Sequence, residues 1–309
     1  MLIQNPPAEI CEGLWMLGTF PYPVYLVRGR QEGAILEGGI SALGPLLQRQ
    51  LADLGIGPDF VRQAVITHAH PDHVMAIPQL RAMFPAVKVL ASAPAAATLN
   101  VDKAIAIFRQ IDAALADSLT KSGVIADPIS PPPLSENRIA VDRVVREGET
   151  ITVEDAVWTV LETPGHSDCS ITLHDAARRI LVISDVTGYY MPDVGTWWPN
   201  YFTSYAAYVH SMERLAALDA ETVCLSHNGA IRGADAVREY FAGAIAATRQ
   251  YHERIVAAAR SGKAPRDIAA ELGAEAHART PVLPLDFFQK NCSLLVKLSL
   301  RHEGIVVEK

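Results

Sequence analysis

The segment Thr67-His68-Ala69-His70-Pro71-Asp72-His73 constrains the fold of this chain more than any other feature. It stands where an apolar strand stops and a predicted helix over Asp72 to Met83 begins. Alternate residues of an extended segment point the same way, so His68 and His70 face one spot, and Asp72 and His73 on the first helical turn can aim back at it. A plain helix start would explain only Asp72. The pattern therefore suits two adjacent cations better than one.

Single ligand-type side chains recur downstream, each just beyond an apolar strand. They are His166 after Thr163-Pro164-Gly165, Asp185 after Ile183-Ser184, and His227 after Leu225-Ser226. Each of them alone is typical of a structural histidine or a turn residue. The ordered set of His-x-His-x-Asp-His, then His, Asp and His, each following a strand, indicates a composite metal site.

The order of elements predicts a layered α/β architecture. Short β-rich runs at 14–17, 24–27 and 34–36 precede a helical pattern over 41–54, and strands and helices then alternate to residue 90. An insertion at 92–137 is Ala-rich with a helical period and ends in a proline-rich run, Asp127–Leu134. The strand pattern returns over 138–183, and nearly everything from Gly233 onward has a helical pattern.

These patterns predict two regions, a catalytic domain over residues 1–232 that includes the insertion 92–137, and a helical region over 233–309. The helical region either lies across the entrance of the site or forms the face of a homodimer. The sequence does not separate these two options.

Composition restricts the partners and the location. The net charge is −7, with 27 basic and 34 acidic residues, which disfavours a nucleic-acid partner. No run approaches the ~20 apolar residues of a membrane helix, and the first residues do not resemble a secretory signal. The four cysteines form no Cys-x-x-Cys pair, so buried free thiols are expected. We therefore expect a cytoplasmic protein with no membrane partner.

With its motifs taken together, the chain resembles the metallo-β-lactamase-fold hydrolases over residues ~10–232. The resemblance implies an αββα sandwich, with two mixed sheets packed face to face, helices outside and the site at one edge. It also implies two divalent metal ions and assigns their ligands. The first ion would be held by His68, His70 and His166, the second by Asp72, His73 and His227, and Asp185 would bridge them.

Residue types narrow the choice within this family. Dizinc β-lactamases commonly carry Cys where Asp185 stands, and flavin-linked diiron members carry Glu where His70 stands. The remaining resemblance is to glyoxalase II, to acyl-homoserine lactonases and to thioesterases. Leu36–Ser41 and the step Gly165–Asp168 are similar to the quinolone-signal response thioesterases, but Ser226 stands where that group usually carries Gly, so the substrate does not transfer.

The expected chemistry is attack of a metal-bridging hydroxide on a thioester of the acyl-CoA or glutathione type. Zinc is the default metal, and iron or manganese would also suit the ligands. Asp72 and His73 are the expected catalytic residues, with Asp72 acting as a ligand or alternatively as a proton shuttle. The alternatives are a lactonase, a mononuclear iron persulfide dioxygenase, and a non-enzymatic sensor built on the same fold.

Aromatic residues follow Asp185 in a segment broken by Gly and Pro, as expected of a binding loop. Tyr189, Tyr190, Trp197 and Trp198 are therefore predicted to bind the substrate, a small molecule with an apolar or aromatic acyl group. The loop Gly18–Pro23 is either a second wall of this pocket or a simple proline-stiffened hairpin.

Overall fold

A computed structural model describes residues 1–126 and 138–305 of the chain. Its contacts divide the chain into unit 1 (Met1–Glu162, Cys169–Ser184 and Ala220–Val237) and unit 2 (Thr163–Asp168, Asp185–Asp219 and Arg238–Lys309). The proline-rich run at Asp127–Leu134 lies outside the described residues. The domain boundary near residue 232 stays a prediction.

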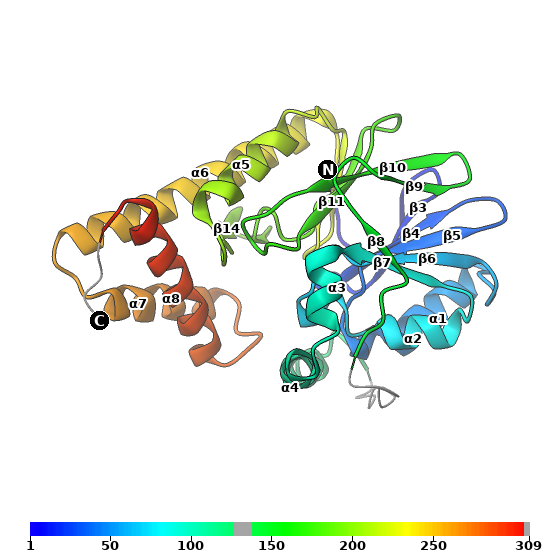
Figure 1. The fold of residues 1–309 in the computed structure, drawn as a ribbon, viewed down its shortest axis with the longest axis horizontal. Coiled ribbons are helices and arrows are strands. Elements are labelled where there is room, and N and C mark those ends of the chain that lie inside the picture. Colours follow the sequence, from blue (N-terminus) through cyan, green and yellow to red (C-terminus); the bar gives the residue numbers. More distant parts are fainter. Residues whose placement is uncertain (127–137, 306–309) are drawn as a thin grey trace. The chain divides into compact units, whose positions relative to one another are not determined.

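Unit 1 is built on two sheets, each of seven strands within the described residues (Figure 1). The first sheet has the strand order β2-β3-β4-β5-β6-β7-β8, and its strands are β2 (Ala8–Cys11), β3 (Leu14–Gly18), β4 (Pro23–Arg28), β5 (Gly33–Leu36), β6 (Val61–Val65), β7 (Lys88–Ser92) and β8 (Arg143–Val145). The second has the order β1-β16-β15-β12-β11-β10-β9, and its strands are β1 (Leu2–Ile3), β9 (Thr150–Val153), β10 (Ala156–Glu162), β11 (Ile171–Asp175), β12 (Ile180–Val182), β15 (Thr222–Cys224) and β16 (Ala230–Arg232).

The two sheets pack face to face because their strands bury alternate side chains. In β10, Trp158 and Val160 point into the core, whereas the preceding Val157 is 47% exposed. Leu14 and Met16 of β3 belong to the same buried cluster, which therefore draws on both sheets. Both sheets mix parallel and antiparallel pairs. The predicted α/β sandwich with a helical C-terminal region is confirmed.

Helices cover the outer face of the first sheet (Figure 1). The turn η1 (Ser41–Leu43) leads into α1 (Gly44–Asp53), which buries Leu47 and Leu51 one helical turn apart and contacts β3. The other helices of unit 1 are α2 (Ile77–Met83), α3 (Ala93–Leu99) and α4 (Asp102–Lys121). The last two occupy the Ala-rich segment, as its helical period predicts.

The helix expected over Asp72 to Met83 begins later than predicted. A 3-10 turn, η2 (Pro71–His73), is followed by Val74 at φ −137°, and α2 starts only at Ile77. The Ala76 amide donates to Gly39 O at 3.2 Å instead of continuing a helix. A Cβ on Gly38 would lie 2.2 Å from His73 O, so only glycine permits this close approach. The tight turn thereby fixes Asp72 and His73 against the β5 end.

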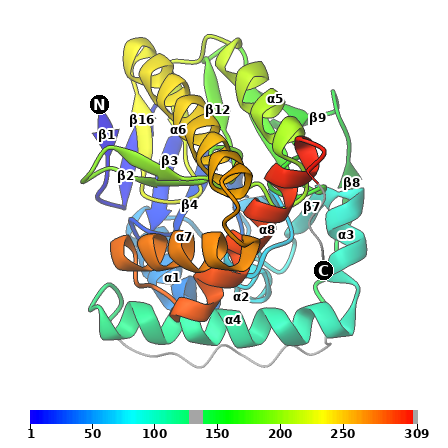
Figure 2. The same ribbon diagram turned by 90° about the vertical axis from the view of Figure 1, so that its left-hand side faces the viewer.

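The long helix α4 is anchored by a buried carboxylate. Asp112 accepts hydrogen bonds from the Ser41 amide at 2.9 Å and from the Ser41 hydroxyl. Burial raises the pKa of the Asp112 carboxyl. Figure 2 shows α4 lying below α1 and α2. The insertion is thus fastened to the segment that follows β5.

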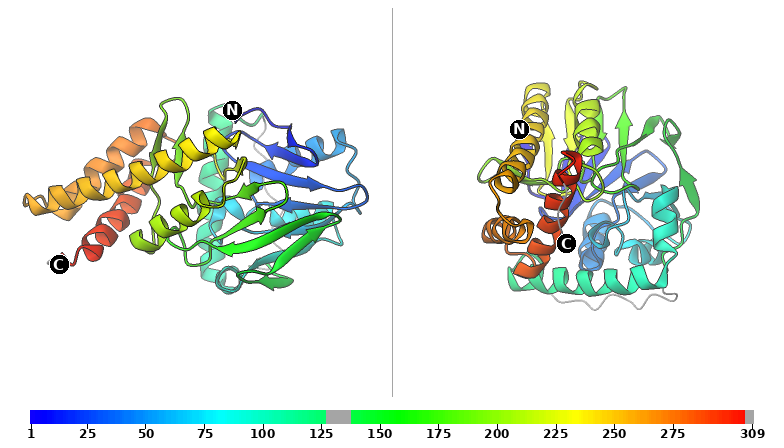
Figure 3. Two further views of the ribbon diagram at one scale, coloured as in Figure 1. Left: turned by 90° about the horizontal axis from the view of Figure 1, so that it is seen from above. Right: turned by 60° about the vertical axis from the view of Figure 1, so that its left-hand side comes forward.

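Unit 2 consists of a hairpin and helices. The hairpin pairs β13 (Tyr189–Met191) with β14 (Thr196–Trp198), and the helices are α5 (Tyr205–Ala216), α6 (Ala234–Arg260, its first turn in unit 1), α7 (Pro265–Arg279) and α8 (Leu285–His302). Figure 3 shows α7 and α8 following α6 and packing against each other. Within the described part of the chain, no helix has both the length and the apolar character needed to cross a bilayer.

We predict that Asp112→Ala destabilises the protein, because it leaves two buried Ser41 donors without their acceptor. The expected loss in the free energy of unfolding is about 2–4 kcal/mol, measured by urea denaturation. Asp117→Ala on the exposed face of the same helix is the matched control. Equal stability of the two variants would contradict the anchoring role.

Candidate metal centre

Unit 1 gathers five of the predicted ligands, and three of them form a tight triad. The Asp72 Oδ2 atom lies 3.3 Å from His73 Nε2 and 3.4 Å from His227 Nε2. One ligand atom from each of the three residues lies within 4.8 Å of the others. His73 and His227 are both buried, and Asp72 is partly exposed. The triad thus combines two residues of the strand-to-helix motif with His227, which lies in the last segment of unit 1.

In each imidazole, the partner of Nδ1 determines which nitrogen can bind a metal ion. The His227 Nδ1 atom lies 2.9 Å from the Pro21 carbonyl oxygen, which can only accept, so Nδ1 carries a proton. The other ring nitrogen, Nε2, faces the Asp72 carboxylate. A charge-assisted hydrogen bond would be about 2.7–2.9 Å long. Two ligands on one tetrahedral zinc ion are ~3.4 Å apart, which matches the observed separation.

Hydrogen-bond partners behind the ring also orient His73. Its Nδ1 atom lies 3.0 Å from Glu37 Oε2, and the Thr67 hydroxyl donates to Glu37 Oε1 at 2.7 Å. A carboxylate behind a ligating imidazole fixes the ring and makes it more basic. The role of Glu37 was not predicted from the sequence. The signal for this role in the sequence was that Glu37 directly follows the apolar strand β5 and precedes two glycines.

His68 and His70 lie beyond β6, as predicted. Their rings meet edge to face with centroids 4.6 Å apart, and the His68 ring is 4.0 Å from that of His73. The His68 Nδ1 atom lies 2.9 Å from Ser184 Oγ. The loop Gly18–Pro23 contributes to this region as well, because it supplies the Pro21 carbonyl and the Tyr22 ring, which packs edge-on against His227 at 5.3 Å.

Unit 2 brings together the other two predicted ligands. The His166 Nε2 atom lies 3.3 Å from Asp185 Oδ2, and His166 Nδ1 donates to the Asn200 carbonyl oxygen at 2.7 Å. The geometry repeats that of the triad, with Nε2 facing a carboxylate oxygen. The loop is held by Gly165, whose carbonyl accepts from the Thr203 amide and whose φ of +128° favours glycine.

The four aromatic residues predicted to bind substrate lie on a regular hairpin rather than in an irregular loop. Tyr189 pairs with Trp198 across the hairpin, and Tyr190 pairs with Trp197. The Tyr190 and Trp197 rings stack at 4.6 Å, and Trp198 packs on Phe288 at 5.1 Å. Pairing of β13 with β14 satisfies the backbone that the Gly and Pro residues were expected to interrupt.

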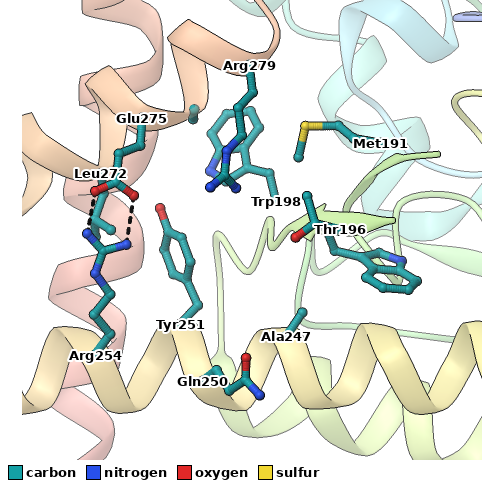
Figure 4. Close-up of a pocket in the computed structure, with 12 residues that line it drawn as sticks. Met191, Thr196, Trp198, Ala247, Gln250, Tyr251, Arg254, Leu272, Glu275 and Arg279 are labelled. Carbon is teal, nitrogen blue, oxygen red and sulfur yellow. Dashed lines mark hydrogen bonds and ion pairs between the residues drawn. The ribbon is translucent and has the colours of Figure 1, made fainter. Parts of the chain in front are cut away.

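A cavity of about 190 Å³ lies between this hairpin and the helices of unit 2 (Figure 4). Trp197 and Trp198 line it, whereas Tyr189 and Tyr190 do not. The Arg254 guanidinium and the Glu275 carboxylate form a two-pronged ion pair on one side. Figure 4 shows Tyr251 and Arg279 pointing toward each other across the cavity. The other lining residues are Met191, Thr196, Ala247, Gln250, Leu272 and Ala276.

Comparison with known proteins identifies the relatives of this chain. The family model of the metallo-beta-lactamase superfamily matches residues 17–227. The acyl-coenzyme A thioesterase MBLAC2 of Gallus gallus is 30% identical over 199 residues, covering 63% of this chain and 66% of the relative. Its Homo sapiens counterpart is 28% identical over 205 residues, covering 63% and 67%. The chain thus spans about two thirds of the curated relatives' length.

Solved structures support the fold. A metallo-beta-lactamase family protein from Thermus thermophilus has a TM-score of 0.64 at 21% identity, covering 96% of this chain and 95% of that one. A metallo-beta-lactamase from Cronobacter sakazakii has a TM-score of 0.58 at 19% identity, covering 84% and 99%.

We predict that Glu37→Gln weakens metal binding by about 10–100-fold, because the ring of His73 loses its charged outer partner. The measurement is competition with a chromogenic chelator, using Glu12→Gln at an exposed position as the control. Unchanged affinity would remove Glu37 from the support of the centre.

Proposed function

Because this chain belongs to the metallo-beta-lactamase superfamily, we propose that it is a dinuclear metal-dependent hydrolase that cleaves thioesters of the acyl-CoA or glutathione type. The observation that carries the proposal is the Asp72, His73 and His227 triad, whose lone pairs face one another at the spacing of ligands on one cation. The relatives named as acyl-coenzyme A thioesterases support the thioester as the substrate class.

The proposed centre combines the triad with His68, His70, His166 and Asp185. Chain connectivity supports this combination. Asp185 directly follows Ser184, whose hydroxyl lies 2.9 Å from His68 Nδ1, and consecutive Cα atoms are ~3.8 Å apart. The segment that carries His166 returns to unit 1 at Cys169, whose Sγ accepts from the Ala69 amide. Both unit 2 ligands thus belong to segments whose neighbouring residues in the chain, Ser184 and Cys169, contact the His68–His70 step within unit 1.

The donor set fits divalent metals of the zinc class. Imidazoles and carboxylates without a thiolate suit zinc, and also iron or manganese. In His73, His166 and His227 the Nδ1 atom contacts a protein oxygen, so Nε2 is the nitrogen that would bind the metal. We propose zinc as the resident metal.

Two such ions would supply a nucleophilic water of lowered pKa and a Lewis acid for the scissile carbonyl. The protein's part is orientation. The η2 turn carries Asp72 and His73, and Glu37 orients the His73 ring. Asp72 would act as a metal ligand or, alternatively, as the carboxylate that accepts a proton. A thiolate leaves without prior protonation, so thioester cleavage asks for no separate general acid in this set.

The substrate side of the proposal rests on the hairpin of unit 2. The first strand of the hairpin follows Asp185 in the chain, and the second strand precedes Asn200, whose carbonyl orients His166. An acyl group against Trp197 and Trp198 would therefore lie on a hairpin that follows the proposed ligand Asp185 in the chain. The Arg279 guanidinium, which forms no ion pair among the described residues, suits an anionic carrier such as CoA or glutathione.

Asp185→Ala is expected to lower metal content and thioester hydrolysis together, with kcat/KM reduced by more than about 100-fold because a direct ligand is lost. Metal content is measured by elemental analysis, and activity with acyl-CoA, S-lactoylglutathione and homoserine lactones. Asp193→Ala in the exposed hairpin turn is the control. Activity that survives without metal would end the hydrolase proposal. Turnover of lactones alone would favour the lactonase, and oxygen uptake with glutathione persulfide would favour the dioxygenase.

Trp197→Ala is expected to raise KM for aromatic acyl thioesters by about 10-fold while kcat changes little, because an apolar contact is lost in ground and transition state alike. Val194→Ala at the tip of the same hairpin, where the side chain is 66% exposed, is the matched control. The same KM in both variants would exclude Trp197 from substrate binding.

A further inference from the structure

A second cluster of ligand-type side chains lies within unit 2, apart in sequence from all seven proposed ligands of the first centre. It joins His252 of α6 to His302 and Glu303 at the end of α8, and one ligand atom from each lies within 4.8 Å of the others. Figure 1 shows the C-terminal end of α8 beside α6. We propose that these three side chains bind one divalent metal ion of the zinc class.

The geometry repeats that of the Asp72 triad. The His252 Nε2 atom lies 3.4 Å from Glu303 Oε1, and the His252 and His302 ring centroids are 5.5 Å apart at 75°. The His73 and His227 rings are 5.3 Å apart at 74°, and their carboxylate lies at the same nitrogen-to-oxygen separation. This separation is too long for a strong charge-assisted hydrogen bond and matches the ~3.4 Å edge of a tetrahedral zinc site.

Hydrogen bonding within the protein leaves His252 poorly satisfied. Its side chain is only 8% exposed, and its Nδ1 atom is buried with no hydrogen-bond partner among the described residues. The long contact with Glu303 is the one polar contact that the described structure gives this ring. The nitrogen directed at another ligand-type atom is therefore Nε2, and this is where a cation would bind.

Neighbouring groups hold the three donors in place. The Tyr205 ring stacks on His252 at 3.9 Å and 12°, and it meets His302 edge-on at 5.0 Å. Arg260 holds Glu303 Oε2 at 2.9 Å, which leaves Oε1 directed at His252. Orientation of ligands by such outer contacts is typical of metal sites.

The charge at this place favours a cation. The cluster stands at the C-terminal end of α8, where the helix dipole is negative, and Glu303 adds a full negative charge. Arg260 opposes it, but its side chain is 63% exposed and its guanidinium is already paired with Glu303. Two of the three ligands are exposed, so water can complete a fourth position. A bound ion would cross-link the C-terminal end of α8 to α6.

The test uses the full chain with the first centre disabled by His70→Ala, Asp185→Ala and His227→Ala, which removes a ligand from each proposed ion and the bridging carboxylate. We expect this background protein to retain one equivalent of Zn²⁺ with a Kd of about 10 μM or tighter by calorimetry. His302→Ala, at an exposed position, should remove that equivalent, and so should Glu303→Gln, which keeps the size of the side chain. His210→Ala on the exposed face of α5 is the control and should retain it.

Thermal unfolding gives a second readout. Zn²⁺ at a hundredfold excess over Kd should raise the Tm of the background protein and of its His210→Ala version, and should leave the His302→Ala version unchanged. The proposal is overturned if the background protein binds no Zn²⁺, or if the stoichiometry is the same with and without His302. Neither result bears on thioester hydrolysis, so the two proposals fail separately.

Discussion

The site depends on one electrostatic arrangement, imidazole nitrogens facing carboxylate oxygens at 3.3–3.4 Å, a separation that suits ligands of one cation. Pro21 and Asn200 carbonyls accept the Nδ1 protons of His227 and His166, so each Nε2 atom presents a lone pair to Asp72 or Asp185. The arrangement is thus suited to binding a metal ion.

The fold tolerates such an arrangement because its core is rigid. Two sheets with interdigitating apolar faces form that core, and the turns beyond β6 and β15 carry the ligands. The turns themselves are restrained, since Gly38 admits the His73 carbonyl at close range and Glu37 links Thr67 to His73. Packing in the core therefore supplies the stability that the polar edge does not.

Unit 2 adds the features that lie outside the metal-ligand motifs. Trp197 and Trp198 of its hairpin line a cavity. In the chain, the hairpin follows Asp185 and precedes Asn200, whose carbonyl orients His166. Its helices bring together His252, His302 and Glu303 in a geometry close to that of the first triad. The same local rule, imidazole facing carboxylate at 3.3–3.4 Å, thus appears in three places of the chain.

The amino-acid sequence was sufficient to predict a layered α/β fold and the ligand-type residues, because strand and helix periods and the spacing of His68–His73 are local properties of the chain. The sandwich itself was expected from the resemblance to a known family. The sequence was not sufficient for the delayed start of α2, the hairpin at Tyr189–Trp198 or the role of Glu37. These depend on which backbone and side-chain groups meet across long sequence separations. The contact of His252 with Glu303 came from the three-dimensional packing alone, since 51 residues separate the two and neither stands in a motif.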